Sequence, residues 1–132
     1  MLRLDYRQLP EYREWLECQL SIDLNPCTTI AVLGDKLLAV GAYNRYTKSS
    51  IEITLVARGN WCNRTILKAA FSYPFEDLKV SRISLTTRED NEKAIKLANK
   101  LGFKQEGITR EYYADRTNAI LFGMLKHECR WI

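Results

Sequence analysis

The order of apolar and polar residues predicts a helix followed by two strands in the first part of the chain. Residues 6–22 carry apolar side chains at helical spacing, and Pro10 stands where the first turn of a helix tolerates it. Residues 28–33 and 37–46 are β-branched and apolar runs, separated by the turn residues 34–36. We therefore expect an amphipathic helix and then a β-hairpin.

A third strand is expected directly after this hairpin. Residues 51–56 alternate in character with a period of two, which is typical of a half-buried strand. The alternation puts Ile51, Ile53 and Leu55 on one face and Glu52, Thr54 and Val56 on the other. Glu52 is the only acid in this run.

The next part of the chain predicts a helix and a parallel strand. The helix follows the polar turn 58–64 and ends near Tyr73, because Pro74 removes a hydrogen bond from the helical ladder. Residues 81–87 alternate again and form a strand. A right-handed crossover through the helix makes that strand parallel to its predecessor.

A second core helix and two further strands complete the expected elements. Asp90 or Asn91 caps this helix at its start, and Gly102 closes it. Residues 107–114 and 119–129 are the last two strands, joined by a short polar turn.

Length and composition bound the class of protein. The chain has 132 residues, of which 46% are hydrophobic and 27% are charged, so we expect one soluble globular domain. No apolar run reaches the roughly 18 residues of a membrane span. The N-terminal residues are not followed by the apolar core of a signal peptide, which favours the cytoplasm.

The net charge and the spacing of the cysteine and histidine residues indicate which kinds of ligand the chain could bind. The net charge of +4 suits an anionic cofactor or an acidic partner surface, and it falls short of a nucleic-acid-binding signature. The four cysteines show no C-x-x-C spacing, and the single His127 has no partner at ligand spacing. We therefore expect free thiols and no metal site.

The turn at residues 58–64 is a candidate anion site. It leads into a helix whose first N–H groups lack partners and carry a partial positive charge. Arg64 and Lys68, four residues apart, add positive charge on one side of that helix. A pyrophosphate is an anion that this arrangement would accept.

Several motifs resemble the acetyl-CoA-binding core of the GNAT superfamily of N-acetyltransferases. They are residues 58–75, the run 78–83, Asn91-x-x-Ala94, and Lys100-Leu101-Gly102-Phe103-x-x-Glu106-Gly107. The branch that looks most similar contains the ribosomal-protein N-acetyltransferases, and within it the short phage-encoded members. The resemblance implies an α+β GNAT fold over residues 1–132, with a mixed, mostly antiparallel sheet and helices on both faces.

The resemblance also implies acetyl-CoA as the cofactor. The family's pantetheine arm pairs with a splayed strand end, here Val56, Ala57 and Arg58, with Asn91 nearby. Its pyrophosphate lies on the loop before the helix, here Gly59, Asn60, Trp61, Cys62, Asn63 and Arg64. Lys96 is added as a cation on the second core helix. The family pattern has small residues at the positions of Trp61 and Asn63, and we expect the Trp61 indole to point away from the phosphates.

The implied reaction is direct attack of an amine on the acetyl thioester, with Glu52 and Asn91 as the catalytic candidates. Glu52 would take the proton that an ammonium must lose, and its alternative role is an ordinary polar residue on a solvated face. Asn91 would contact the thioester region, and its alternative role is a helix cap. Family members that use a tyrosine acid carry it where Ala98 stands. Since a CoA thiolate is a fair leaving group, either the reaction proceeds without such an acid, or Tyr112 or Tyr113 serves from the next strand.

The acceptor is left open by the sequence. A protein N-terminus, a lysine, a small amine and an aminoacyl-tRNA all fit the implied reaction. Trp61, Ala98 and the short N-terminal region favour the alternative, a catalytically inactive GNAT-fold module that binds a protein or RNA partner. Trp131 would be an exposed aromatic unless something covers it, and a homodimer interface is one option.

Overall fold

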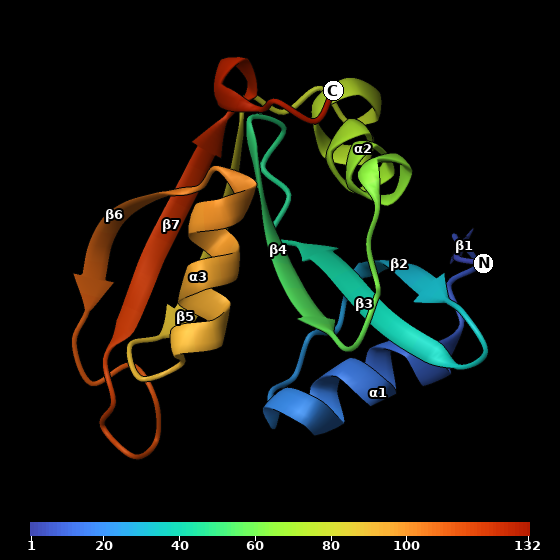
Figure 1. The fold of residues 1–132 in the computed structure, drawn as a ribbon. Coiled ribbons are helices and arrows are strands. Elements are labelled where there is room, and N and C mark those ends of the chain that lie inside the picture. The colour runs from blue at the N-terminus through green and yellow to red at the C-terminus, as the bar shows by residue number, and fades with distance from the viewer.

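A seven-stranded mixed sheet forms the centre of the computed structural model, which describes residues 1–132 (Figure 1). Its strand order is β1-β2-β3-β4-β5-β7-β6, and only β4 and β5 are parallel neighbours. The strands are β1 (Arg3–Asp5), β2 (Thr28–Leu33), β3 (Leu37–Asn44), β4 (Ser50–Ala57), β5 (Arg82–Arg88), β6 (Lys104–Thr109) and β7 (Ala119–Leu125). The α-helices are α1 (Pro10–Leu20), α2 (Arg64–Ser72) and α3 (Glu92–Leu101), and none is long and apolar enough to cross a membrane.

The expected helices and strands are present, and the corrections concern their ends. Helix α1 begins at Pro10 rather than at residue 6, because the Gln8 side chain binds the backbone of Thr29 and holds the preceding segment extended. Strand β1 has no counterpart among the expected elements, since three residues are too few to show a period.

The last two strands also end differently from the expectation. Strand β6 begins at Lys104, directly after the buried Phe103, and ends at Thr109, so Tyr112 and Tyr113 lie in a loop. Strand β7 ends at Leu125, whose N–H donates to the Glu128 carboxylate at 2.9 Å. That bond closes a short 3-10 turn where the strand was expected to continue.

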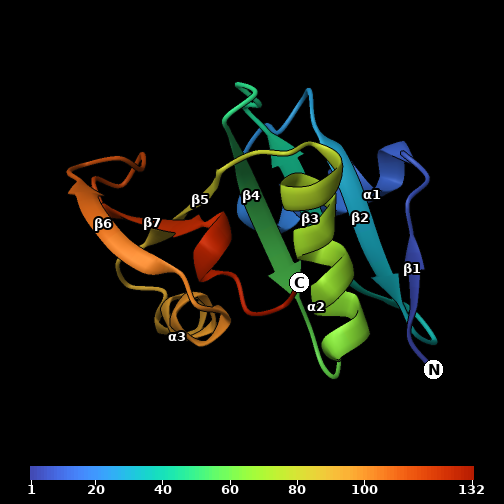
Figure 2. The ribbon, with the colours of Figure 1, turned by 90° about the horizontal axis from the view of Figure 1, so that it is seen from above.

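The helices cover both faces of the sheet. On one face, Tyr12 and Leu16 of α1 pack against small residues of β2 and β3. On the other face, α2 and α3 contribute Leu67, Phe71 and Leu101 to the main core, which the strands complete with residues such as Phe122. Figure 2 shows α2 and α3 on one side of the sheet and α1 on the other. This confirms the expected three-layer arrangement.

Helix α2 ends where a proline removes a backbone donor. Pro74 has no N–H, so the carbonyl of Ala70 lacks the partner that a regular helix would supply. The Tyr43 hydroxyl donates to that carbonyl at 2.7 Å. Beyond it, Leu78 N–H bonds to Tyr73 C=O in a π-helical turn.

The run Gly102-Phe103-x-x-Glu106 has a structural role at the end of α3 and in strand β6. Gly102 adopts φ +106 and closes α3, a conformation that favours glycine. The Glu106 carboxylate lies over Gly123 of β7, where a Cβ would stand within 2.5 Å of it, and it pairs with Arg82 of β5. The motif therefore ties α3 and three strands together.

Candidate functional site

Strands β4 and β5 pair over three residues and then separate. Their parallel register joins Ser50 to Arg82 and ends at Glu52 and Ser84, whereas β4 continues beside β3 as far as Ala57. Residues 53–57 therefore have no strand partner on their β5 side, and Figure 1 shows the two strands diverging there. Such an open edge presents N–H and C=O groups that require a partner.

Backbone alternation determines which residues of β4 face this open edge. The N–H of Arg58 donates to the carbonyl of Leu38 at 2.8 Å, on the β3 side. Successive residues direct their backbone groups to opposite edges, so Leu55 and Ala57 direct theirs to the open side. Within the expected segment of Val56, Ala57 and Arg58, the backbone of Ala57 is the one turned toward the gap.

A cavity of about 360 Å³ lies between the separated strands. Its lining includes Ile53, Thr54 and Leu55 from β4, and Leu85, Thr86 and Thr87 from β5. Of the site residues predicted from the sequence, Glu52, Trp61 and Asn91 line it, and so do the candidate acids Tyr112 and Tyr113. The tertiary structure therefore brings both catalytic candidates to one cavity.

In the loop before α2, residue 59 is the position whose backbone conformation favours glycine. Gly59 adopts φ +59, and a Cβ there would have open space around it. Asn63 is extended and caps α2, because its side chain accepts the N–H of Ile66 at 2.9 Å. The half-buried Trp61 packs against the core. Trp61 stands where the family pattern has a small residue. The loop accommodates its indole because the backbone at Trp61 is not left-handed.

Of the residues expected to supply positive charge to the cofactor, Arg58 contacts other side chains of the protein and Lys96 lies outside the cavity lining. The Arg58 guanidinium donates to Gln19 of α1 and lies 5.9 Å from the Trp15 ring centroid. Lys96 is exposed on α3 and does not line the cavity. Asn60 and Cys62 are exposed in the loop. Contact of these residues with a cofactor stays a prediction.

Arg64 lies beside the C-terminal segment. Its guanidinium is 5.9 Å from the ring centroid of Trp131 and donates to the carbonyl of Arg130 at 3.5 Å. The Trp131 indole N–H donates to the carbonyl of Leu101 at 2.8 Å, and the ring packs on the main core. The chain itself therefore covers Trp131, and the homodimer stays a prediction that the structure does not test.

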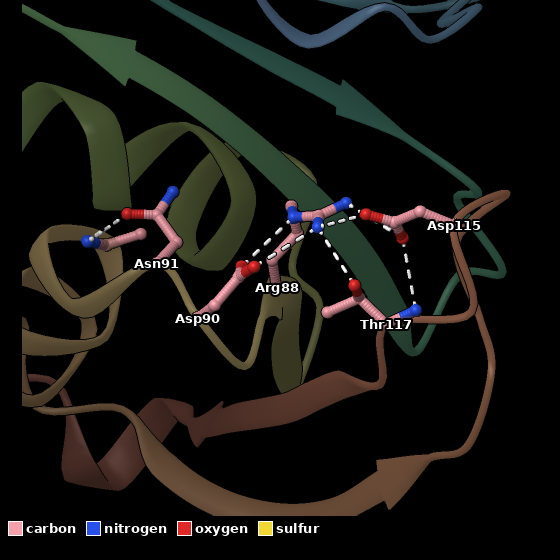
Figure 3. Close-up of polar contacts among 6 residues, drawn as sticks. Arg88, Asp90, Asn91, Asp115 and Thr117 are labelled. Carbon is pink, nitrogen blue, oxygen red and sulfur yellow. Dashed lines mark hydrogen bonds and ion pairs between the residues drawn. The ribbon is translucent and has the colours of Figure 1, made fainter.

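An ion-pair network holds the entrance to α3. Arg88 at the end of β5 binds Asp90, Asp115 and the Thr117 hydroxyl (Figure 3). Hydrogen bonds from Arg88 hold the pKa of both carboxyls below their ordinary values. The network fixes the β6–β7 loop against the turn that carries Asn91. It therefore positions the loop that bears Tyr112 and Tyr113.

Asn91 uses one side-chain atom as a helix cap. Its Oδ1 accepts the N–H of Ala94 at 3.1 Å, which confirms Asn91 as the N-cap of α3 (Figure 3). The Nδ2 amide is the remaining donor of the side chain. Because Asn91 lines the cavity, the cap and a contact to a bound group are compatible.

Glu52 lies on the α1 face of the sheet with a weak partner. Its carboxylate is 3.7 Å from Arg45 Nε, and the two side chains are 24% and 72% exposed. Tyr113 also lines the cavity, and burial together with Tyr112 raises the pKa of its phenol. A phenol that stays protonated at neutral pH is a hydrogen-bond donor. Ala98, at the position of the family's tyrosine, is buried in the core and has no such group.

Two residues of the cavity wall were not predicted. Asn44 Oδ1 and Thr87 Oγ1 are buried atoms without a hydrogen-bond partner, and both residues line the cavity. Most buried polar atoms in proteins are paired, so these two atoms lack the partner that a bound group or a water molecule would supply. The sequences of their strands are typical of an ordinary β-sheet. No local pattern distinguishes a polar residue that lines a cavity from one that faces solvent.

The comparisons with known proteins agree with this geometry. Residues 2–103 match the model of the Acetyltransferase (GNAT) family. The match includes the N-terminal segment, which the motifs had not covered. Among curated proteins, no relative matches the chain.

Solved structures share the fold at low sequence identity. A mutant spermidine/spermine N-acetyltransferase SpeG from Vibrio cholerae is 18% identical with a TM-score of 0.75, and the alignment covers 96% of each chain. A ribosomal-protein-S5-alanine acetyltransferase from Vibrio fischeri is also 18% identical, with a TM-score of 0.64, covering 90% of this chain and 69% of that one. These likenesses establish the fold.

Proposed function

Because the chain belongs to the GNAT acetyltransferase family, we propose that it transfers the acetyl group of acetyl-CoA to a primary amine by direct attack. The family uses acetyl-CoA as its acetyl donor. The observation that carries the proposal is the open β4 edge beside a cavity that Glu52 and Asn91 line.

Several groups of this chain suit an acyl-CoA. The backbone of Leu55 and Ala57 faces the open edge. It would pair with an extended amide-bearing arm as an added strand does. The N–H groups of Arg64 and Thr65 have no acceptor within α2, because the first turn of a helix leaves its donors free. Those donors, together with the loop from Gly59 to Asn63, form the binding site for the pyrophosphate.

Acetyl-CoA, when bound, would supply a thioester carbonyl. The transfer would form one N–C bond and break one C–S bond, and CoA would leave as a thiolate. Glu52 accepts the proton that the amine loses, directly or through water. The cavity walls orient the amine, and this positioning supplies much of the rate. Asn91 Nδ2 and the Tyr113 phenol are donors on the β5 side of the cavity.

The first test is calorimetric titration of the full chain with acetyl-CoA, followed by a screen of amine acceptors. We expect a dissociation constant on the order of micromolar. Glu52→Gln should retain this binding and lower kcat/KM by about 100-fold, because the carboxylate acts after binding. Glu11→Gln, on the exposed side of α1, is the matched control and should behave as the parent chain.

Two outcomes contradict different parts of the proposal. Unchanged turnover in the Glu52 variant would remove the base assignment and leave the enzyme. Absence of acetyl-CoA binding would remove the enzyme and leave a GNAT-fold binding module.

A further inference from the structure

The β6–β7 loop supplies part of the cavity wall through two tyrosines. Tyr112 and Tyr113 both line the cavity, and their rings meet edge to face with centroids 5.1 Å apart. Burial is the main cause that raises the pKa of the Tyr113 phenol, and the Glu52 carboxylate adds to it. The phenol and the carboxylate therefore interact across the cavity. Glu52 stands where the open edge of β4 begins, whereas the loop expected to hold the pyrophosphate follows the far end of that strand.

The side chain of Arg88 holds this loop against the end of β5. Its Nη2 donates to Asp115 Oδ2 at 2.6 Å and to Thr117 Oγ1 at 3.0 Å, and both acceptors belong to the loop (Figure 3). Its guanidinium carbon lies 4.9 Å from the ring centroid of Tyr113, within the range of a cation–π contact. Arg88 therefore contacts both the loop and the ring that the loop carries.

The turn from residue 113 to residue 117 is closed by its own backbone. The N–H of Tyr113 donates to the carbonyl of Thr117 at 3.2 Å, and the N–H of Arg116 donates to the carbonyl of Tyr113 at 2.8 Å. The turn therefore moves as a unit, and a displacement of Asp115 would displace Tyr113 with it.

The base of the loop has a separate attachment. The Asn118 side chain accepts the N–H of Glu111 at 2.9 Å and donates to the Glu89 carboxylate at 3.2 Å. These bonds do not involve Arg88. Loss of the Asp115 carboxylate would therefore loosen the turn at 113–117 while the loop stays attached at its base.

We propose that Arg88 is a positioning residue for the acceptor side of the site. Through Asp115 and Thr117 it holds Tyr113 across the cavity from Glu52, and the acceptor nitrogen lies between the Glu52 carboxylate and the Tyr113 hydroxyl. That hydroxyl has no hydrogen-bond partner in the protein, so it is free to accept an N–H of the amine. The inference rests on the proposed acetyl transfer, and it assigns the turn at 113–117 to the acceptor rather than to acetyl-CoA.

The test uses hexylamine as the probe, a primary amine whose chain suits a lining that is mostly hydrophobic. Its binding to the full chain, with CoA present, is followed through the ring signals of 13C-labelled tyrosine, and Tyr113→Phe identifies the signal of Tyr113. We expect hexylamine to shift that signal.

Asp115→Asn tests the contact between Arg88 and the loop. Asparagine keeps an oxygen for the N–H of Thr117, which Asp115 accepts at 3.1 Å, but it directs an NH2 group toward the guanidinium. We expect the Kd of hexylamine to rise about three- to fivefold, as loss of a partly exposed ion pair allows. The Kd of acetyl-CoA should stay within about twofold of the parent value, which a general loss of structure would not permit.

Asp90→Asn is the matched control, because Asp90 also binds Arg88, at 3.0 Å, but lies outside the loop. There the Kd of hexylamine should stay within about twofold. In a chain that carries Arg88→Gln, Asp115→Asn should cause no further loss, since both residues act through one contact. A Tyr113 signal that does not respond to hexylamine, or equal losses in the Asp90 and Asp115 variants, would overturn the inference. Absence of acetyl-CoA binding is the separate failure of the acetyltransferase proposal.

Discussion

At the scale of single residues, Asn91 combines two tasks that one substitution can separate. Its Oδ1 caps α3 through Ala94, while its Nδ2 belongs to a residue that lines the cavity. Serine is as good a helix cap as asparagine but has no amide donor. Alanine removes both groups.

We predict that Asn91→Ala lowers the free energy of unfolding by about 1 kcal/mol, through loss of the cap. Asn91→Ser should stay within about 0.5 kcal/mol of the parent chain. Urea unfolding measures both values, and acetyl transfer is assayed in parallel. A role in the reaction predicts reduced kcat/KM in the serine variant as well. Full activity in that variant would reduce Asn91 to a cap.

At the scale of elements, the end of α2 depends on a contact from the sheet. Pro74 leaves the Ala70 carbonyl without a helical donor, and the buried Tyr43 hydroxyl of β3 supplies one. Burial also raises the pKa of Tyr43, so the hydroxyl stays protonated and remains a donor. This bond joins α2 to the sheet next to the cavity.

Tyr43→Phe should therefore lower the free energy of unfolding by about 1 to 3 kcal/mol, because the buried carbonyl loses its partner. Tyr46→Phe removes the same hydroxyl from a half-exposed side chain and should cost less than about 0.5 kcal/mol. Equilibrium unfolding in urea compares the two. Equal costs would show that the Ala70 carbonyl finds another donor.

At the scale of the whole molecule, two carboxylates connect different elements of the fold. Asp5 of β1 binds Arg7 and the Tyr12 hydroxyl of α1, and Asp115 binds Arg88 across the site. These hydrogen bonds hold the pKa of both carboxyls well below the usual range. Both groups therefore bind protons more weakly in the folded than in the unfolded chain.

The sign of the pH dependence follows from this difference. The stabilisation is present above the unfolded-state pKa of about 4 and is lost as the pH falls below it. We expect the thermal midpoint to decrease between pH 6 and pH 3. The decrease should be smaller in Asp5→Asn and Asp115→Asn than in Asp35→Asn, which changes an exposed turn residue without an ion pair. An identical decrease in all three would contradict the assignment.

Local patterns determined the elements of this protein and its family motifs. Periodicity, Pro74, the Asn91 cap and Gly102 are properties of adjacent residues, so the sequence alone predicts the helices and most strands. The fold class follows from the resemblance that the family motifs carry. Glu52 and Asn91 became catalytic candidates through the resemblance to the GNAT family, which assigns a function to their places on a strand and at a turn.

Tertiary structure alone decided where β4 and β5 separate, which backbone groups face the gap, and what covers Trp131. It also set Asn44 beside Glu52, because the register of two strands that a turn joins depends on the geometry of that turn and on the packing of both strands. The site is a product of that register. Features that depend on residues close in space therefore required the tertiary structure. Features that depend on residues close in sequence could be predicted from the sequence.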